Sequence, residues 1–317
     1  MHFIFASERR EAGRAPDLAP PDMPESNQEA LERLLRVLDL ERLGNDSFRG
    51  EVDQQEGRLF GGLILGQAVM AAGRTVERGV IHSLHAYFLR AGKPVEPVTY
   101  NVERLRDGRT FTTHRVTAVQ GSDAIFEASV SFTVGEPGIS HQKSMPEAPD
   151  PEGQPTWWES IRATLPPAAQ EMMSRRGPMR RGWTHPLDMR SVAAGRVGED
   201  NLPHRTVWAK PIAELPEDPL IHAAAMAYMS DSGLVATVGT VYGMWGPGGA
   251  SASLDHAMWW HHPPRFDDWL LYVSDSPAAH AARGLIFGHI YNREGTLVAS
   301  VAQEGLFRTG RQPGPKA

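Results

Sequence analysis

Two stretches of the chain are apolar around most of their helical circumference, and each precedes a series of alternating segments. Residues 58–73 and 219–231 lack a broad polar face, which predicts two buried helices. The strand patterns that follow these helices lie at 81–90, 98–105, 110–120, 124–134, 253–261, 269–274, 282–292 and 297–307. The order of one long helix followed by a meander occurs twice, which predicts an α+β fold with antiparallel sheets rather than βαβ units.

A short motif also occurs in both halves, as SLHAYF at 83–88 and SLDHAMWW at 253–260. We therefore interpret the chain as a duplicated unit. The expected parts are a mobile N-terminal tail at 1–26, a first module at 27–135, a proline-rich connecting segment at 136–203, a second module at 204–309 and a C-terminal tail at 310–317. Within or just after the connecting segment, 189–192 and 206–210 are candidate strands that start the second module.

Composition limits the chemistry that the chain can perform. Hydrophobic residues make up 41% and charged residues 22% of the 317 positions, as in ordinary globular domains. The absence of cysteine excludes disulfides, a cysteine nucleophile and thiolate metal sites. A net charge of −6 gives no general attraction to nucleic acid, and we expect no such partner. No apolar run is long enough to span a membrane and no secretory signal is recognisable, so we expect a cytoplasmic location.

The second half carries polar residues at positions where the first half is mostly apolar. Asp231 ends the second buried helix, Ser253 begins the next strand, and Gln303 lies on the last strand. Such a trio could hold and polarise a water molecule, with the carboxylate accepting its proton. Each residue also has an ordinary interpretation: Asp231 as an exposed helix end, Ser253 as a strand-start residue, and Gln303 as an outward side chain on an edge strand.

Other polar patterns give weaker indications. Gly61 and Gly62, near the start of the first buried helix, could present backbone N–H groups to a carbonyl oxygen or phosphate, or could simply allow tight packing. Asp255 and His256 are neighbours on a strand, so their side chains point to opposite faces and do not form an acid–base pair. The histidines at 261–262 have no further ligands at metal-site spacing, and we expect no metal. No nucleophile elbow or P-loop is present.

Several longer motifs resemble those of the acyl-CoA thioesterase II family, the TesB-type thioesterases. The matching segments are 58–62 (RLFGG), 66–68 (GQA), 82–92 (HSLHAYFLRAG), 104–113 (RLRDGRTFTT), 253–259 (SLDHAMW) and 302–305 (AQEG). They occur in order over nearly the whole chain. The resemblance implies a double hotdog fold, in which an antiparallel sheet in each half wraps a long central helix. It also implies hydrolysis of acyl-CoA to a free fatty acid and CoA.

The resemblance further assigns roles to particular residues. The family's catalytic Asp, Thr or Ser, and Gln fall on Asp231, Ser253 and Gln303. We expect Gly61 and Gly62 to bind the substrate through their backbone N–H groups. The expected partner is the acyl-CoA substrate, with no cofactor and no metal. Exposed sheet edges and the habit of the family favour a homo-oligomer.

Two other functional classes remain open at this point. One is a hotdog-type acyl-CoA hydratase, which requires a His/Asp pair in the hydratase motif, and we find no such motif. The other is a non-catalytic acyl-CoA binding protein, which would hold the substrate without releasing CoA.

Overall fold

The computed structural model describes residues 25–54, 57–164, 170, 184–244 and 250–308. The expected C-terminal tail at 310–317 lies outside the described residues, as do positions 1–24 of the expected N-terminal tail.

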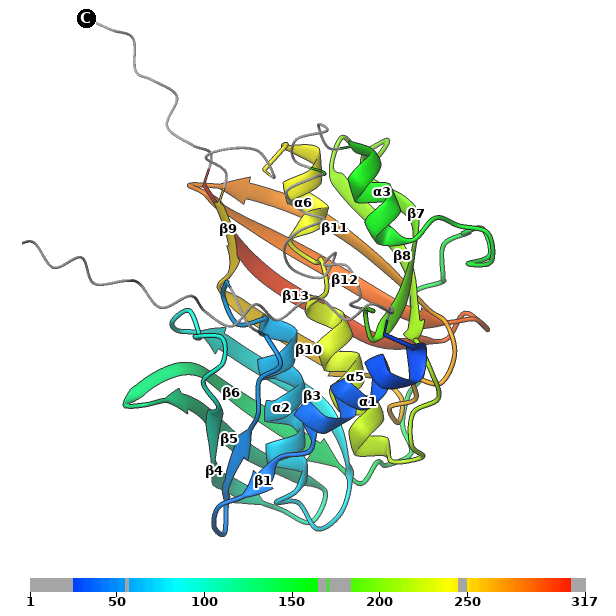
Figure 1. The fold of residues 1–317 in the computed structure, drawn as a ribbon. Helices are drawn as coiled ribbons and strands as arrows, with labels where there is room; N and C mark the ends of the chain where they lie inside the picture. The colour runs from blue at the N-terminus through cyan, green and yellow to red at the C-terminus, as the bar shows by residue number, and fades with distance from the viewer. Residues whose placement is uncertain (1–24, 55–56, 165–169, 171–183, 245–249, 309–317) are drawn as a thin grey trace, which may run out of the picture.

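The first half consists of two helices and a meander that curls around one of them (Figure 1). Helix α1 (Asn27–Leu38) begins with a capping box, in which Ser26 and Glu29 each accept a hydrogen bond from the other's backbone N–H. Helix α2 (Gly61–Gly73) is buried from Gly62 to Ala72. The strands are β1 (Glu41–Arg42), β2 (Ser47–Gly50), β3 (Val80–Phe88), β4 (Val98–Asp107), β5 (Phe111–Gln120) and β6 (Asp123–Thr133).

The second half repeats this plan around helix α5 (Pro219–Asp231). Asp218 caps the helix, with its side chain accepting from the Leu220 N–H at 2.8 Å, and Pro219 follows at the first helical position. The described part of this half also contains helices α3 (Trp157–Thr164) and α6 (Ala236–Val241), and the sequence patterns given above did not include either of them. The strands are β7 (Leu187–Val197), β8 (Pro203–Pro211), β9 (Ala250–Ser253), β10 (Asp255–Trp260), β11 (Leu270–His280), β12 (Arg283–Asn292) and β13 (Leu297–Arg308).

The strands of both halves belong to one antiparallel sheet. Its order is β1-β2-β4-β5-β6-β3-β10-β13-β12-β11-β8-β7, with β9 paired to β13. The two halves join where β3 pairs with β10, and Ala86 lies opposite His256 at this seam. The predicted α+β class and the antiparallel meanders are confirmed. The two sheets expected around the two helices are continuous across the seam.

The prediction of a single strand at 253–261 is wrong in one respect, because the structure divides this segment between β9 and β10. The pairing register with β13 shifts by one residue between the pair Ser253–Gly305 and the pair Ala257–Ala302. Leu254 lies at this irregularity, where its N–H donates to Glu304 and its C=O accepts from Phe88. A bulge of this kind re-aims the side chains beside it, and Ser253 is one of them.

Helices α2 and α5 pack against each other in the centre of the molecule. A Cβ atom added at Gly66 would lie 3.1 Å from the carbonyl oxygen of Ala224, and one added at Gly62 would lie 2.5 Å from that of Tyr228. Only glycine allows the backbones to approach so closely at Gly62. The pairing of Gly62 with Tyr228 and of Gly66 with Ala224 makes the helices antiparallel. The end of α5 therefore lies beside the start of α2.

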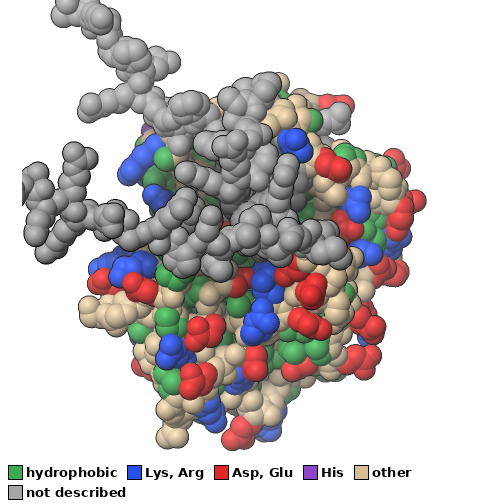
Figure 2. Space-filling view, viewed as in Figure 1, with side chains coloured by type: hydrophobic (Ala, Val, Ile, Leu, Met, Phe, Trp, Pro, Cys, Tyr) green, Lys and Arg blue, Asp and Glu red, His purple; other side chains and the backbone are tan. Residues whose placement is uncertain are grey.

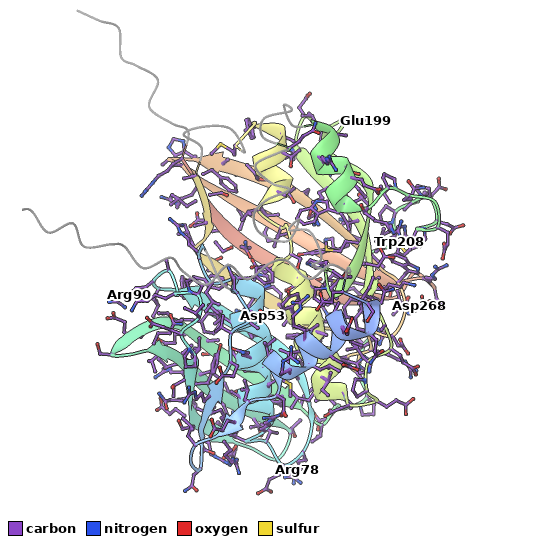
Figure 3. All side chains as sticks on the ribbon, viewed as in Figure 1. Asp53, Arg78, Arg90, Glu199, Trp208 and Asp268 are labelled. Atoms are coloured by element: carbon purple, nitrogen blue, oxygen red, sulfur yellow. The ribbon has the colours of Figure 1, made fainter. Side chains whose placement is uncertain are left out.

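Part of the segment expected to connect the halves packs against the sheet. Trp208 of β8, labelled in Figure 3, donates a hydrogen bond from its ring N–H to the carbonyl of Pro149 at 2.8 Å. Met145 and Ala148 lie against the small apolar cluster that contains Trp208. Strand β7 also comes from this segment and pairs with β8 along its length.

Charges on the visible surface are mixed. On the face drawn in Figure 2, basic and acidic side chains are interspersed over the described part, and neither sign forms an extended patch. Within the described residues, no helix has both the length and the apolar character needed to cross a membrane.

Candidate active site

The three polar residues singled out in the second half meet in one place. The Ser253 hydroxyl donates to Oδ1 of Asp231 at 3.2 Å, and Nε2 of Gln303 donates to the Ser253 hydroxyl at 2.9 Å. Asp231 is 8% exposed and Gln303 is fully buried. The ordinary interpretations of an exposed aspartate and an outward-facing glutamine are therefore wrong.

Each of the three side chains lies on a different element of the second half. Asp231 is the last residue of α5, Ser253 the last of β9, and Gln303 lies on β13. Alternate residues of β13 are buried from Leu297 to Phe307, and this alternation turns Gln303 inward. The antiparallel pairing of β9 with β13 brings Ser253 to the same end of the sheet.

The carboxyl group of Asp231 is a weak acid in this position. Burial raises its pKa from 3.8 to about 7, because the ionised form loses its hydration. Hydrogen bonds from Ser253, from the backbone N–H of Gly62 and from Gln303 act in the opposite direction. None of these three groups is charged. A pKa near neutrality suits a group that accepts a proton at physiological pH.

The paired glycines at the start of α2 complete the same site from the first half. A Cβ at Gly61 would lie 2.7 Å from Oδ2 of Asp231 and 3.0 Å from the ring of Phe88. The N–H of Gly62 interacts with Asp231 directly, as its effect on the carboxyl pKa indicates. Phe60 precedes the pair, and its ring packs edge-on against Tyr228 at 5.0 Å. The site is therefore built from both halves, with aromatic rings around it.

His256 and Ser230 lie directly behind the trio, and the sequence patterns did not single them out as site residues. Nδ1 of His256 lies 2.6 Å from Oε1 of Gln303, and Nε2 lies 2.9 Å from the hydroxyl of Ser230. Asp255 turns to the other face and accepts from the Glu304 N–H at 2.7 Å, as the alternation predicted. His256 occupies one of the buried positions of β10, whose residues alternate between buried and half-buried. This alternation was the sequence signal that could have indicated that His256 points inward.

The remaining histidine pattern does not form a metal site. His261 lies 2.8 Å from the hydroxyl of Ser300. Among the residues that the structure describes, no group of three or more His, Asp or Glu side chains is arranged to hold a metal ion.

The chain matches known proteins over both halves. A family model for acyl-CoA thioesterase matches residues 183–306, and a model for the acyl-CoA thioesterase N-terminal domain matches residues 48–133. Acyl-coenzyme A thioesterase 8 of Mus musculus is 37% identical over 294 residues, which cover 86% of this chain and 88% of the relative. Acyl-CoA thioesterase 2 of Haemophilus influenzae is 32% identical, with coverage of 88% and 98%.

Comparison with a solved structure points to the same family and also identifies the fold. An acyl-CoA thioesterase II from Mycobacterium marinum superposes with a TM-score of 0.71 at 38% identity, covering 87% of this chain and 98% of that one. The expected double hotdog fold is thereby confirmed. On these matches, the chain belongs to the acyl-CoA thioesterase II, or TesB-type, family of thioester hydrolases.

Proposed function

We propose that this protein hydrolyses acyl-CoA to a fatty acid and CoA by means of a water molecule activated by Asp231, Ser253 and Gln303. The observation that carries the proposal is the hydrogen-bonded contact among these three side chains, with the carboxyl pKa raised to about 7. A buried carboxylate with that pKa can take a proton from water while the water attacks the thioester carbonyl.

Each member of the trio has a separate task in this proposal. Asp231 accepts the proton, and its distance from bulk solvent makes it a stronger base than an exposed aspartate. Ser253 and Gln303 orient the water and the carboxylate. No acyl-enzyme intermediate is needed. The CoA thiolate leaves without a strong general acid, since a thiol has a pKa of about 8.5.

The start of α2 would meet the substrate carbonyl. The N–H groups of Gly61 and Gly62 lie at a helix N-terminus, where the backbone donors have no partners within the helix. Because the Gly62 N–H also interacts with Asp231, the Gly61 N–H would be the main donor to the carbonyl oxygen, and the Gly62 N–H would be shared with the carboxylate. Negative charge that develops on the carbonyl oxygen would be stabilised there. The rings of Phe60 and Phe88, which flank the two glycines, would offer apolar contacts to the acyl group.

The decisive assay measures thiol release from acyl-CoA with a chromogenic thiol reagent. The proposal expects catalytic release of CoA over a panel from short to long acyl chains. A non-catalytic binder would bind the same substrates without release. A hydratase would instead add water to crotonyl-CoA and leave the thioester intact. Binding without release, or hydration of crotonyl-CoA as the main reaction, would contradict the proposed function.

The rate of hydrolysis is expected to fall as pH falls through about 7. Asp231 must be ionised to accept a proton, and burial raises its pKa to about 7, so protonation below that value removes the base. The measurement is kcat/KM for one acyl-CoA from pH 5 to pH 9. An acidic limb near pH 4, where an exposed aspartate titrates, would argue against Asp231 as the base.

We also propose the expected division of the chain into two modules and its assembly into a homo-oligomer. Modules at 27–135 and 204–309 would form the two halves, with β7 from the segment 136–203 added at the edge of the second. A homo-oligomer is supported by large apolar side chains exposed on the sheet, such as Tyr87 at 64% and Phe287 at 40%. Sedimentation of the purified chain tests it, and a monomer at micromolar concentration would contradict it.

The expected cytoplasmic location is a proposal too. Saccharomyces cerevisiae has a relative named peroxisomal acyl-coenzyme A thioester hydrolase 1, which is 26% identical. Fractionation of cells that express the chain distinguishes the two locations.

A further inference from the structure

The side chain of His256 links the proposed active site to the interior of the second half. His256 lies on β10, is 1% exposed, and has a side-chain partner at each ring nitrogen. Nδ1 faces Oε1 of Gln303 at 2.6 Å, and Nε2 faces the hydroxyl of Ser230 at 2.9 Å. Gln303 and Ser230 are both 0% exposed. Because all three groups are shut off from bulk solvent, the place of each hydrogen is decided by the neighbouring side chain.

The direction of each hydrogen bond follows from the chemistry of its partners. Nε2 of Gln303 donates to Ser253, so Oε1 is the atom that faces His256. A carbonyl oxygen can only accept, which places the ring hydrogen on Nδ1. Burial lowers the pKa of His256 to about 4, so the ring is neutral at pH 7. With the ring hydrogen on Nδ1, Nε2 accepts from the Ser230 hydroxyl, which shares its one hydrogen between Nε2 at 2.9 Å and the Ala227 carbonyl at 2.8 Å. One directed chain of hydrogen bonds thus runs from Ser230 to the carboxylate of Asp231.

We propose that His256 is a positioning residue whose Nδ1–H tautomer keeps the amide of Gln303 turned toward Ser253. In the opposite orientation, Oε1 of Gln303 would face Ser253 and take its hydroxyl hydrogen, and Asp231 would lose a donor. The tautomer excludes that orientation, because the amide N–H₂ would then face a ring N–H. The inference rests on the proposed hydrolysis. His256 acts on the carboxylate through Gln303, which interacts with Asp231 itself and also donates to Ser253, and it does not touch the substrate.

The chain offers a matched control in His114. This histidine is also 0% exposed and also has two side-chain partners, with Nδ1 at 2.8 Å from Thr75 and Nε2 at 2.8 Å from Asp107. It lies on β5 in the first half and contacts none of the three proposed catalytic side chains. Removing it leaves the buried hydroxyl of Thr75 without its imidazole partner, whereas Asp107 is 53% exposed and can bind water instead. The variant therefore reports the structural cost of losing a buried imidazole.

The first test compares three variants in thiol release from acyl-CoA. We expect His256→Leu to lower kcat by about 10- to 100-fold, the loss that corresponds to one hydrogen bond to a charged group, with KM nearly unchanged. His256→Asn can place an amide N–H where Nδ1 stood, and we expect it to recover most of this loss. His114→Leu should leave kcat near the parental value. Parental kcat in His256→Leu, or an equal loss in His114→Leu, would overturn the inference.

The pH profile separates positioning from mere folding. The hydrogen bond from Ser253 lowers the pKa of Asp231, so its loss should raise that pKa and move the acidic limb of kcat to higher pH. We expect this movement in His256→Leu and none in His114→Leu. The described groups that act on Asp231 are Ser253, Gln303, the Gly62 N–H and the phenol of Tyr272. Burial raises the pKa of Tyr272 far above its ordinary value, so none of these groups titrates in that range. An unmoved limb in His256→Leu would reject the role.

A second measurement is made on the unmodified protein and does not depend on its activity. Long-range ¹H–¹⁵N spectra of protein labelled in histidine report which ring nitrogen carries the hydrogen, and His256→Asn identifies the signal. The expected result is the Nδ1–H tautomer, and the Nε2–H tautomer would overturn the inference even if His256→Leu does not fold. The proposed function fails separately, since its failure appears as absent thiol release in the parental chain.

Discussion

Replacement of Asp231 with Asn is expected to lower kcat for acyl-CoA hydrolysis by about 10²- to 10⁴-fold, the range for loss of a general base. Asparagine has nearly the same shape and can still accept a hydrogen bond from Ser253. Its amide cannot take a proton from water. The loss should therefore appear in kcat, with KM for the acyl-CoA changed much less. Near-parental activity of the variant would remove Asp231 from the proposed mechanism.

The same substitution provides its own check on folding. The pKa of Asp231 is higher in the folded chain than the ordinary 3.8. The protonated carboxyl group therefore adds to the free energy of unfolding below pH 4, and this contribution is lost as pH rises through about 7. Asparagine has no charge to bury, so the variant should not lose this part of the free energy of unfolding, which is roughly 4 kcal/mol at most. We expect the Tm of Asp231→Asn to exceed that of the parent at pH 8, with a smaller difference at pH 5. A lower Tm at pH 8 would show that the carboxylate is not held as a costly buried charge.

Replacement of Gly61 with Ala is expected to lower kcat by about 100-fold, because small displacements of reacting groups can cost that much. The new methyl group would lie 2.7 Å from Oδ2 of Asp231 and 3.0 Å from the ring of Phe88. The carboxylate must then move away from its position beside the start of α2. Alanine favours a helix more than glycine does, so the helix itself should not be weakened.

Gly44→Ala is the control for this prediction. A Cβ at Gly44 meets no atom within 4 Å, so the variant should keep both kcat and Tm. Kinetics and thermal unfolding of both variants separate displacement of the carboxylate from a general effect of adding a methyl group. Parental kcat in Gly61→Ala would mean that the carboxylate can shift without consequence, and would contradict the close approach as a requirement of the site.

Much of the fold could be predicted because the two buried helices are encoded locally. The predicted second helix, at 219–231, coincides with α5, and the strands predicted at 98–105 and 297–307 differ from β4 and β13 by only a few residues at their ends. Helix α6 was missed because six residues are too few for a periodic pattern to be recognised. The break at Leu254 was missed because a bulge depends on the register of the paired strand rather than on local sequence.

The sequence alone determined which residue types were available and on which elements they lie. Asp231, Ser253 and Gln303 were recognisable as polar residues where the other half is apolar, and the motifs around them identified the family. Their contact was decided only by the tertiary structure, since the hydrogen bonds join residues 22 and 50 positions apart. Burial of Asp231 and the partners of His256 also depend on that packing. A pKa and a tautomer are set by the surroundings of a group, and local sequence does not contain those surroundings.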